Sequence, residues 1–275
     1  MKSKNISKKE FIKKKVTPIK ESLFLKSFHL AKSNPNKVGL MILFDVLFLV
    51  SLYGLQTLFQ YFAKTLALPQ NITSAFVFIS LSLIFYLAVI FAYSFFKYSI
   101  LDSLKSLFEA TEFSFKRLGQ FYLLNVIITG IFFAVIIVFN FLLASIKQTY
   151  APFVFIFLAI PYLLFLYVTI NMSHPLFYEG SSVKESINQG FKTTFTRIKA
   201  YRETILIIIM FALLTWILFL GSGYLIRLVS SKNYSLYLNT YAYFKQASIV
   251  IFDIVFYFVI LINRISFYYI IRETK

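Results

Sequence analysis

Cysteine is absent from this 275-residue chain, and histidine occurs only at His29 and His174. The lack of cysteine excludes disulfide bonds and thiolate metal sites, and two interfacial histidines cannot build a His-rich zinc site. The chain also lacks a Walker loop, a GxGxxG loop and a GxSxG elbow. Glu109 and Glu112 are interpreted as part of a solvated helix face. We therefore expect a protein that is not an enzyme and that carries no cofactor or metal.

Charged residues are also scarce. They make up 14% of the chain, whereas soluble domains contain about 25%. Hydrophobic residues account for 59% of the sequence and aromatic residues for 20%. This hydrophobic fraction is higher, and the charged fraction lower, than in a water-soluble domain. The composition therefore predicts an integral membrane protein.

Six apolar runs are long enough to cross a bilayer, which takes about 20 residues per helix. They lie near residues 38–62, 75–98, 120–146, 153–173, 204–228 and 246–269. This pattern predicts an all-α fold, a six-transmembrane-helix bundle formed by a single membrane domain over residues 17–275. Residues 1–16 are Lys-rich, and we expect them to form a disordered basic cytoplasmic tail.

The net charge of +17 would suit a nucleic-acid partner, but its placement argues against one. Most Lys and Arg residues flank the apolar runs, as topology signals do. If the chain crosses six times, 23 of its 28 basic residues fall on the side that holds both termini. This bias predicts a multi-pass protein of the plasma membrane with both ends in the cytoplasm. We expect the lipid bilayer to be the partner, and we expect no nucleic-acid partner.

The stretch from 174 to 203 predicts an amphipathic helix on the membrane surface. Ser182 followed by Glu185 fits a capping box at its start. One helical face carries the apolar stripe Val183, Ile187, Phe191, Phe195, Ile198 and Tyr201. Basic residues lie off that stripe. A pair of basic residues also precedes the third apolar run. We expect these side chains to contact anionic lipid head groups: Lys184, Lys192, Arg197, Lys199, Arg202, Lys116 and Arg117.

A repeat with a period of 80 residues links these two regions. Phe115-Lys116-Arg117-Leu118 with Phe121 resembles Phe195-Thr196-Arg197-Ile198 with Tyr201, and the offset is 80 at each matched position. The face Leu107, Thr111, Phe115 and Leu118 resembles the later amphipathic stripe, and a weaker copy surrounds Phe24 to Lys32. We therefore predict three parallel repeats, each with a cytoplasmic interfacial helix followed by two spans.

The end of the fourth apolar run carries a local pattern. It reads Pro175, then Glu179-Gly180, then Ser182-Val183-Lys184-Glu185-Ser186 before the basic helix. In this layout the chain resembles a group of six-span prokaryotic membrane proteins. That group includes the membrane domain fused to glycerophosphodiester phosphodiesterases. The resemblance implies the fold and transfers no catalytic residue.

Ionisable residues inside a span are unfavourable and therefore mark candidate sites. Asp45 and Arg264 lie roughly 7–10 Å to the cytoplasmic side of the midplane, given a rise of about 1.5 Å per residue. Their similar depth allows an ion pair between the first and last spans, which either fixes helix register or belongs to a solute or proton site. Arg264 could instead snorkel to the interface. Asp253 lies farther out, with Asn125 and Asn140 as expected partners, and is the strongest single functional candidate. Asn171 closes the fourth span.

Two functional hypotheses remain at this point. The first is a protein that binds a membrane-protein partner or organises lipids, favoured by the basic amphipathic helices. The second is a transporter or channel for a small solute. Its path would be lined by polar residues of the spans, namely Asp45, Asp253, Arg264, Asn125, Asn140 and Asn171. Whether these side chains converge on one cavity distinguishes the two hypotheses.

Overall fold

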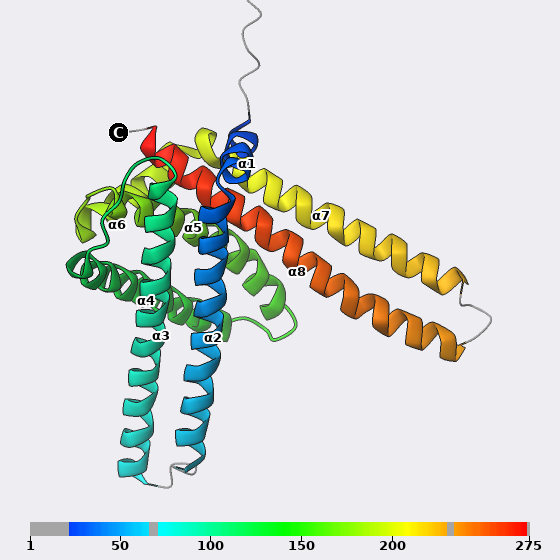
Figure 1. Ribbon diagram of the computed structural model, residues 1–275. Coiled ribbons are helices and arrows are strands. Elements are labelled where there is room, and N and C mark those ends of the chain that lie inside the picture. The colour runs from blue at the N-terminus through cyan, green and yellow to red at the C-terminus, as the bar shows by residue number, and fades with distance from the viewer. Residues whose placement is uncertain (1–21, 66–70, 230–233, 274–275) are drawn as a thin grey trace, which may run out of the picture.

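The computed structural model describes residues 22–65, 71–229 and 234–273, and it is entirely helical in its regular structure (Figure 1). The predicted basic tail, residues 1–16, lies outside the described residues. The helices are α1 (Leu23–Ser33), α2 (Pro35–Thr65), α3 (Ile72–Ser106), α4 (Phe115–Ala144), α5 (Ala151–Tyr178), α6 (Val183–Thr196), α7 (Ile198–Val229) and α8 (Tyr234–Arg272).

Six of these helices, α2, α3, α4, α5, α7 and α8, are long and apolar enough to cross a membrane. The all-α six-span prediction is therefore confirmed. Most of the helices extend beyond the predicted apolar runs, because backbone hydrogen bonding continues after hydropathy falls. For example, α3 continues eight residues beyond the predicted end at residue 98. At its start, Asn71 accepts a hydrogen bond from the backbone N–H of Ser74 and caps the helix.

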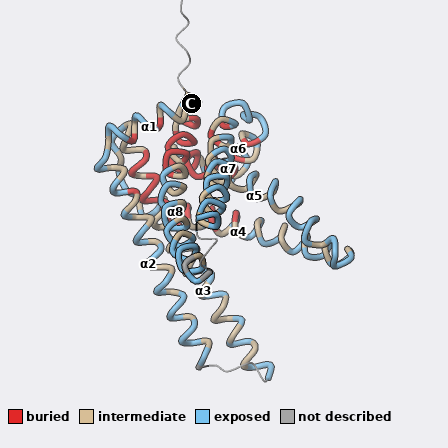
Figure 2. Tube along the Cα trace, turned by 90° about the vertical axis from the view of Figure 1, so that its right-hand side faces the viewer, coloured by how far each residue is buried: buried red, intermediate tan, exposed pale blue. Residues whose placement is uncertain are grey.

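The spans form three antiparallel hairpins, α2–α3, α4–α5 and α7–α8, which meet at one end and point in different directions at the other (Figures 1 and 2). We call the shared end, where α1, α6 and the C-terminal turn of α8 lie, the convergent end. Buried residues gather there (Figure 2). Toward the turns of the hairpins, large apolar side chains such as Tyr53, Phe157 and Trp216 are exposed, as lipid-facing residues are.

Buried positions recur in the three hairpins at the predicted spacing. Met41, Phe121 and Tyr201 are each 80 residues apart, and all three are buried near the start of the first helix of a hairpin. The second helices also carry a buried tyrosine: Tyr98 and Tyr178 are 80 residues apart, and Tyr268 follows 90 residues later. These equivalent core positions support the internal threefold repeat.

The middle repeat lacks the interfacial helix that we predicted. Residues 107–114 form a turn and a loop, so Leu107, Thr111, Phe115 and Leu118 do not share a helix face. Two aromatic residues of this loop pack against buried tyrosines at the edge of the core. The ring of Phe108 stacks on Tyr268 at 5.8 Å between centroids, and the ring of Phe113 meets Tyr98 at 5.2 Å. These tertiary contacts outweigh a short helical periodicity, which has little stability of its own.

The helix α6 forms with its predicted capping box. The backbone N–H of Ser182 donates to the Glu185 carboxylate at 2.9 Å, and this contact lowers the pKa of Glu185. However, the prediction of one continuous stripe is wrong, because the helix ends at Thr196 and α7 begins at Ile198.

The face that α6 buries also differs from the predicted apolar stripe. Ser186, Gly190 and Thr194 are buried against α5, whereas Phe195 is 65% exposed. A Cβ atom at Gly190 would lie 1.9 Å from Ser173 Oγ, so only glycine allows this approach. Small residues let membrane helices pack closely, and apolar ones can remain toward lipid.

Candidate functional site

The helix α1 is fixed to α7 and α8 at the convergent end. The Glu203 carboxylate of α7 accepts hydrogen bonds from the hydroxyl of Ser22 and from the backbone N–H groups of Leu23 and Phe24, both at 3.3 Å. It thus satisfies free N–H groups at the start of α1, where negative charge is favourable. A buried hydrogen bond of 2.8 Å joins Ser27 of α1 to Ser266 of α8.

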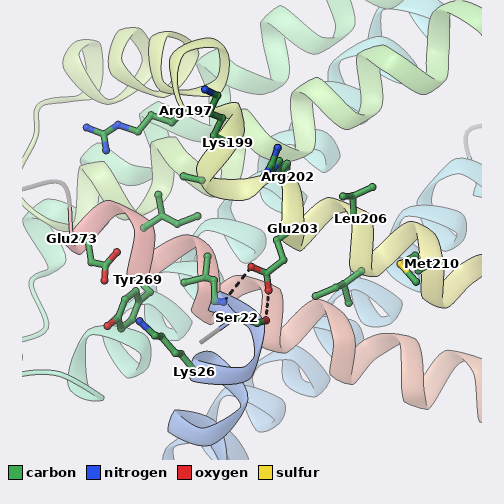
Figure 3. Close-up of a pocket in the computed structure, with 14 residues that line it drawn as sticks. Ser22, Lys26, Arg197, Lys199, Arg202, Glu203, Leu206, Met210, Tyr269 and Glu273 are labelled. Carbon is green, nitrogen blue, oxygen red and sulfur yellow. Dashed lines mark hydrogen bonds between the residues drawn. The ribbon is translucent and has the colours of Figure 1, made fainter. Parts of the chain in front are cut away.

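This arrangement encloses a groove of about 750 Å³ between α1, α7 and α8 (Figure 3). We refer to it as the basic groove. Its rim carries four cations, which are Lys26, Arg197, Lys199 and Arg202. Its wall continues along α7 as the apolar side chains Leu206, Ile207 and Met210. An adjoining hollow of about 490 Å³ shares Ile207 and Met210 and extends the apolar surface to Ile217.

Positive charge dominates the basic groove. Two carboxylates, Glu203 and Glu273, also line it, but Glu203 is engaged by the start of α1. Lys26 lies 5.9 Å from the ring centre of Tyr269. In the described part of the chain, Arg197, Lys199 and Arg202 form no ion pair with a carboxylate. The groove therefore presents free cations beside an apolar wall.

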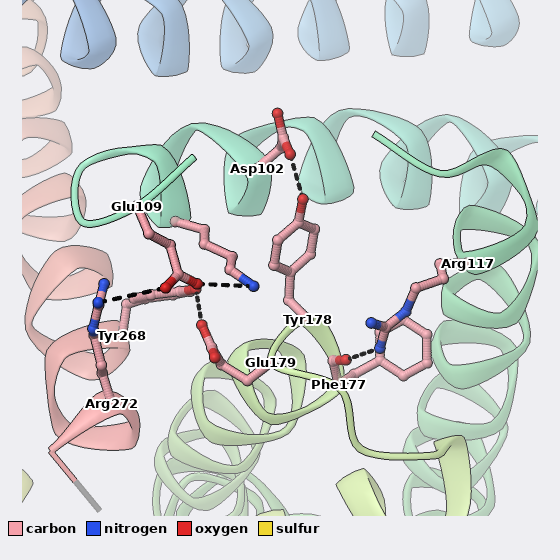
Figure 4. Close-up of polar contacts among 9 residues, drawn as sticks. Asp102, Glu109, Arg117, Phe177, Tyr178, Glu179, Tyr268 and Arg272 are labelled. Atoms are coloured by element: carbon pink, nitrogen blue, oxygen red, sulfur yellow. Dashed lines mark hydrogen bonds and ion pairs between the residues drawn. The ribbon is translucent and has the colours of Figure 1, made fainter. Parts of the chain in front are cut away.

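The predicted lipid-contacting residues divide into three groups. Arg197, Lys199 and Arg202 meet at the basic groove, together with Lys26, which the sequence analysis did not single out. The exposed side chains Lys184, Lys192 and Lys116 lie outside the groove. Arg117 has a structural contact, since its guanidinium donates to the Phe177 carbonyl at 2.5 Å and covers the Phe177 ring (Figure 4). Lys26 could be found only once α1 was placed beside α7.

The predicted ion pair between the first and last spans is present. The Arg264 guanidinium lies 2.5 Å from the Asp45 carboxylate. The hydroxyl of Tyr257 donates to the same carboxylate oxygen at 2.7 Å. Because Asp45 belongs to α2 and Arg264 to α8, the pair joins the first and third hairpins.

The other polar residues predicted for a solute path do not join this pair. Asn125 is buried and donates to Ser94 at 3.0 Å, and Asn171 donates to the Tyr167 carbonyl at 2.9 Å. Asp253 and Asn140 are exposed on the surfaces of α8 and α4. The six candidates thus do not converge on one cavity. Depth along a span is readable from sequence, but the direction in which a side chain points depends on helix packing.

Two buried residues were misplaced by the sequence analysis. His174, expected at a solvated interface, is 1% exposed, and its ring meets Phe121 at 4.8 Å between centroids. Neither ring nitrogen has a hydrogen-bond partner among the described residues. Lys97, counted among the 23 basic residues of the side that holds both termini, lies nine residues before the end of α3 and is 8% exposed. Apolar runs are delimited by hydropathy, so a lysine near their edge is easily assigned to the flank.

The six spans and the apolar lipid-facing surface define this chain as a multi-pass membrane protein. Comparison with protein-family models, with curated proteins and with solved structures finds no match. The resemblance to the six-span group that includes the phosphodiesterase membrane domain therefore stays a prediction.

Proposed function

We propose that this protein binds an anionic phospholipid in the basic groove and does so without catalysis. The observation that carries the proposal is the union of free cations and an apolar wall in one groove. The head group lies among Lys26, Arg197, Lys199 and Arg202, and the acyl chain follows α7 past Met210. A membrane lipid has this same division between charge and hydrocarbon.

Charge placement supports the same proposal. Basic side chains close to a membrane surface attract anionic lipids by about 1 kcal/mol each. Within the described ranges, most Lys and Arg residues belong to the convergent end, which supports a cytoplasmic location for it in the plasma membrane. We therefore place the bound lipid in the cytoplasmic leaflet. Hydrogen bonds from α1 to Glu203 of α7 and to Ser266 of α8 fix the three helices that line the groove. The groove is therefore preformed.

The alternative function, transport of a small solute, has less support. Only Asp45 and Arg264 of the six predicted path residues meet, and both are engaged with each other.

A membrane-protein partner stays a prediction. The exposed carboxylate of Asp253 would be its contact, because an unpaired charge on a span is unfavourable in lipid. A photo-crosslinking amino acid at position 253 would detect such a partner in cells.

The lipid proposal is tested with the purified full-length protein in nanodiscs of phosphatidylglycerol or phosphatidylcholine, with bound lipid counted by native mass spectrometry after transfer to detergent. We expect retention of phosphatidylglycerol over phosphatidylcholine. The triple variant Arg197→Gln/Lys199→Gln/Arg202→Gln should weaken this retention by roughly 100-fold, since three contacts of about 1 kcal/mol are lost.

The matched control is Lys116→Gln/Lys184→Gln/Lys192→Gln, which removes the same charge from exposed positions outside the groove. Its retention of phosphatidylglycerol should stay near that of the natural chain. Equal loss in both triple variants would mean that lipid responds to net charge alone, and the groove would have no special role.

A further inference from the structure

A separate cavity lies between α2, α3 and α8. Its volume is about 280 Å³, and it is partly open. Its polar lining consists of Asp45, Tyr93, Lys97, Tyr257 and Arg264. None of its lining residues lines the basic groove, so the two spaces are independent.

Positive charge exceeds negative charge in this cavity. One oxygen of Asp45 accepts hydrogen bonds from both Arg264 and Tyr257. Lys97 is 8% exposed, yet it forms neither a hydrogen bond nor an ion pair among the described residues. Two cations therefore face a single carboxylate. A buried ammonium that shares one carboxylate with a guanidinium is only partly neutralised, which is unfavourable, most of all inside a membrane.

The cavity has unused hydrogen-bond donors. The Lys97 ammonium has three N–H groups, and the Arg264 guanidinium has five, of which the contact with Asp45 uses only part. Tyr93 lies one helical turn before Lys97 and lines the same space. Donors of this kind form their strongest hydrogen bonds with carboxylate or phosphate oxygens.

The size of the cavity is suitable for a small anion. Its volume of about 280 Å³ is several times the roughly 30 Å³ that one water molecule occupies in the liquid. A phosphate or carboxylate group fits with some of its hydration. The apolar side chains Phe48, Leu49, Phe96 and Ile100 complete the lining and lower the polarity around the charges.

We propose that this cavity is an intramembrane binding site for an oxyanion, a phosphate or carboxylate group, with Lys97 as its principal contact. The anion neutralises Lys97 and accepts further hydrogen bonds from Arg264, which Asp45 holds in place. A free anion and the phosphate of a lipid head group present the same chemistry. The inference does not depend on the lipid proposed for the basic groove.

The test uses the full-length protein in neutral detergent. Thermal unfolding is followed during a titration with sodium phosphate, with sodium chloride of equal ionic strength as the reference. A parallel sample is mixed with phosphatidic acid, and bound lipid is counted by native mass spectrometry. We expect phosphate, phosphatidic acid or both to bind, because a ligand of the folded state raises the Tm.

Four variants assign the binding to Lys97. Lys97→Met should abolish the phosphate-dependent rise in Tm and the phosphatidic acid bound in this cavity, while lipid in the basic groove stays bound. Lys97→Arg should preserve binding at both sites. Lys64→Met removes a lysine from the exposed end of α2 and should behave like the natural chain. The groove variant Arg197→Gln/Lys199→Gln/Arg202→Gln should keep the Lys97-dependent part, which separates the two sites.

Each outcome decides the proposal. Lys97-dependent binding of phosphate alone indicates a free anion, and binding of phosphatidic acid alone indicates a lipid head group. The proposal is overturned if the natural chain binds neither, or if Lys97→Met binds both as well as the natural chain does. Should Lys97→Met fail to fold, phosphorus NMR of phosphate mixed with the natural chain still decides whether an anion binds.

Discussion

The hydroxyl of Tyr268 donates a hydrogen bond to the Glu179 carboxylate and thereby joins the third hairpin to the second (Figure 4). In the same way, the hydroxyl of Tyr178 donates to Asp102 and joins the second hairpin to the first. Near these contacts, Glu109 pairs with Lys105 at 3.1 Å and with Arg272 at 3.6 Å. The three hairpins are thus connected by polar contacts at the end where they meet.

Removal of either tyrosine hydroxyl should loosen the convergent end. Tyr178→Phe and Tyr268→Phe each remove one hydrogen-bond donor from a carboxylate, and we expect each to lower stability by about 1–3 kcal/mol. Thermal unfolding in detergent measures the effect. Tyr150→Phe is the control, because Tyr150 is exposed at the turn between α4 and α5. Unchanged Tm values in both core variants would show that these hydrogen bonds do not hold the hairpins together.

Removing only one partner of the Asp45–Arg264 ion pair should lower stability more than replacing both partners with neutral residues. Asp45→Asn leaves Arg264 uncompensated in the membrane, and we expect a loss of about 3 kcal/mol. The double variant Asp45→Asn/Arg264→Gln should recover part of this loss. A double-mutant cycle by thermal unfolding gives the coupling free energy.

Asp253→Asn provides the matched control for that cycle. It makes the same chemical change on an exposed face of α8. We expect a change in stability within about 0.5 kcal/mol. A loss as large as that of Asp45→Asn would instead indicate that Asp253 has a partner in the assembled protein.

Gly190 should tolerate no side chain. Gly190→Ala places a methyl group 1.9 Å from Ser173 Oγ and 3.2 Å from Ser173 Cα, so α6 must move away from α5. Overpacking of this kind lowers stability by about 1–3 kcal/mol. Gly130→Ala is the control, because nothing lies within 4 Å of the added Cβ on α4. Its stability should be equal or higher, since alanine favours a helix. Similar losses in both variants would contradict the close packing of α6.

The proposed orientation can be tested directly because the chain has no cysteine. Lys192→Cys on α6 and Lys147→Cys between α4 and α5 each introduce a single exposed thiol. In intact cells, a membrane-impermeant maleimide should label position 147, while position 192 should react only after the membrane is opened. The reverse pattern would place the convergent end outside the cytoplasm.

Some of the tertiary structure was readable from sequence because it depends on position along a helix. The depths of Asp45 and Arg264 followed from the rise per residue, and their pairing was predicted correctly. The 80-residue offset likewise matched buried positions such as Phe121 and Tyr201. In contrast, Asp253 was the strongest single candidate, yet it faces away from the core. Rotation about the helix axis, which depth does not reveal, decides this.

The sequence by itself determined the number of spans and the placement of Lys and Arg at their ends, because apolar length and charge placement are local properties of the chain. Only the tertiary structure decided that Lys26 of α1 joins the cations of α7, and that Lys97 faces the Asp45–Arg264 pair. Both outcomes depend on how helices distant in sequence pack. That packing was set by small residues such as Gly190 and by aromatic contacts such as Phe108 with Tyr268, whose partners no local pattern identifies.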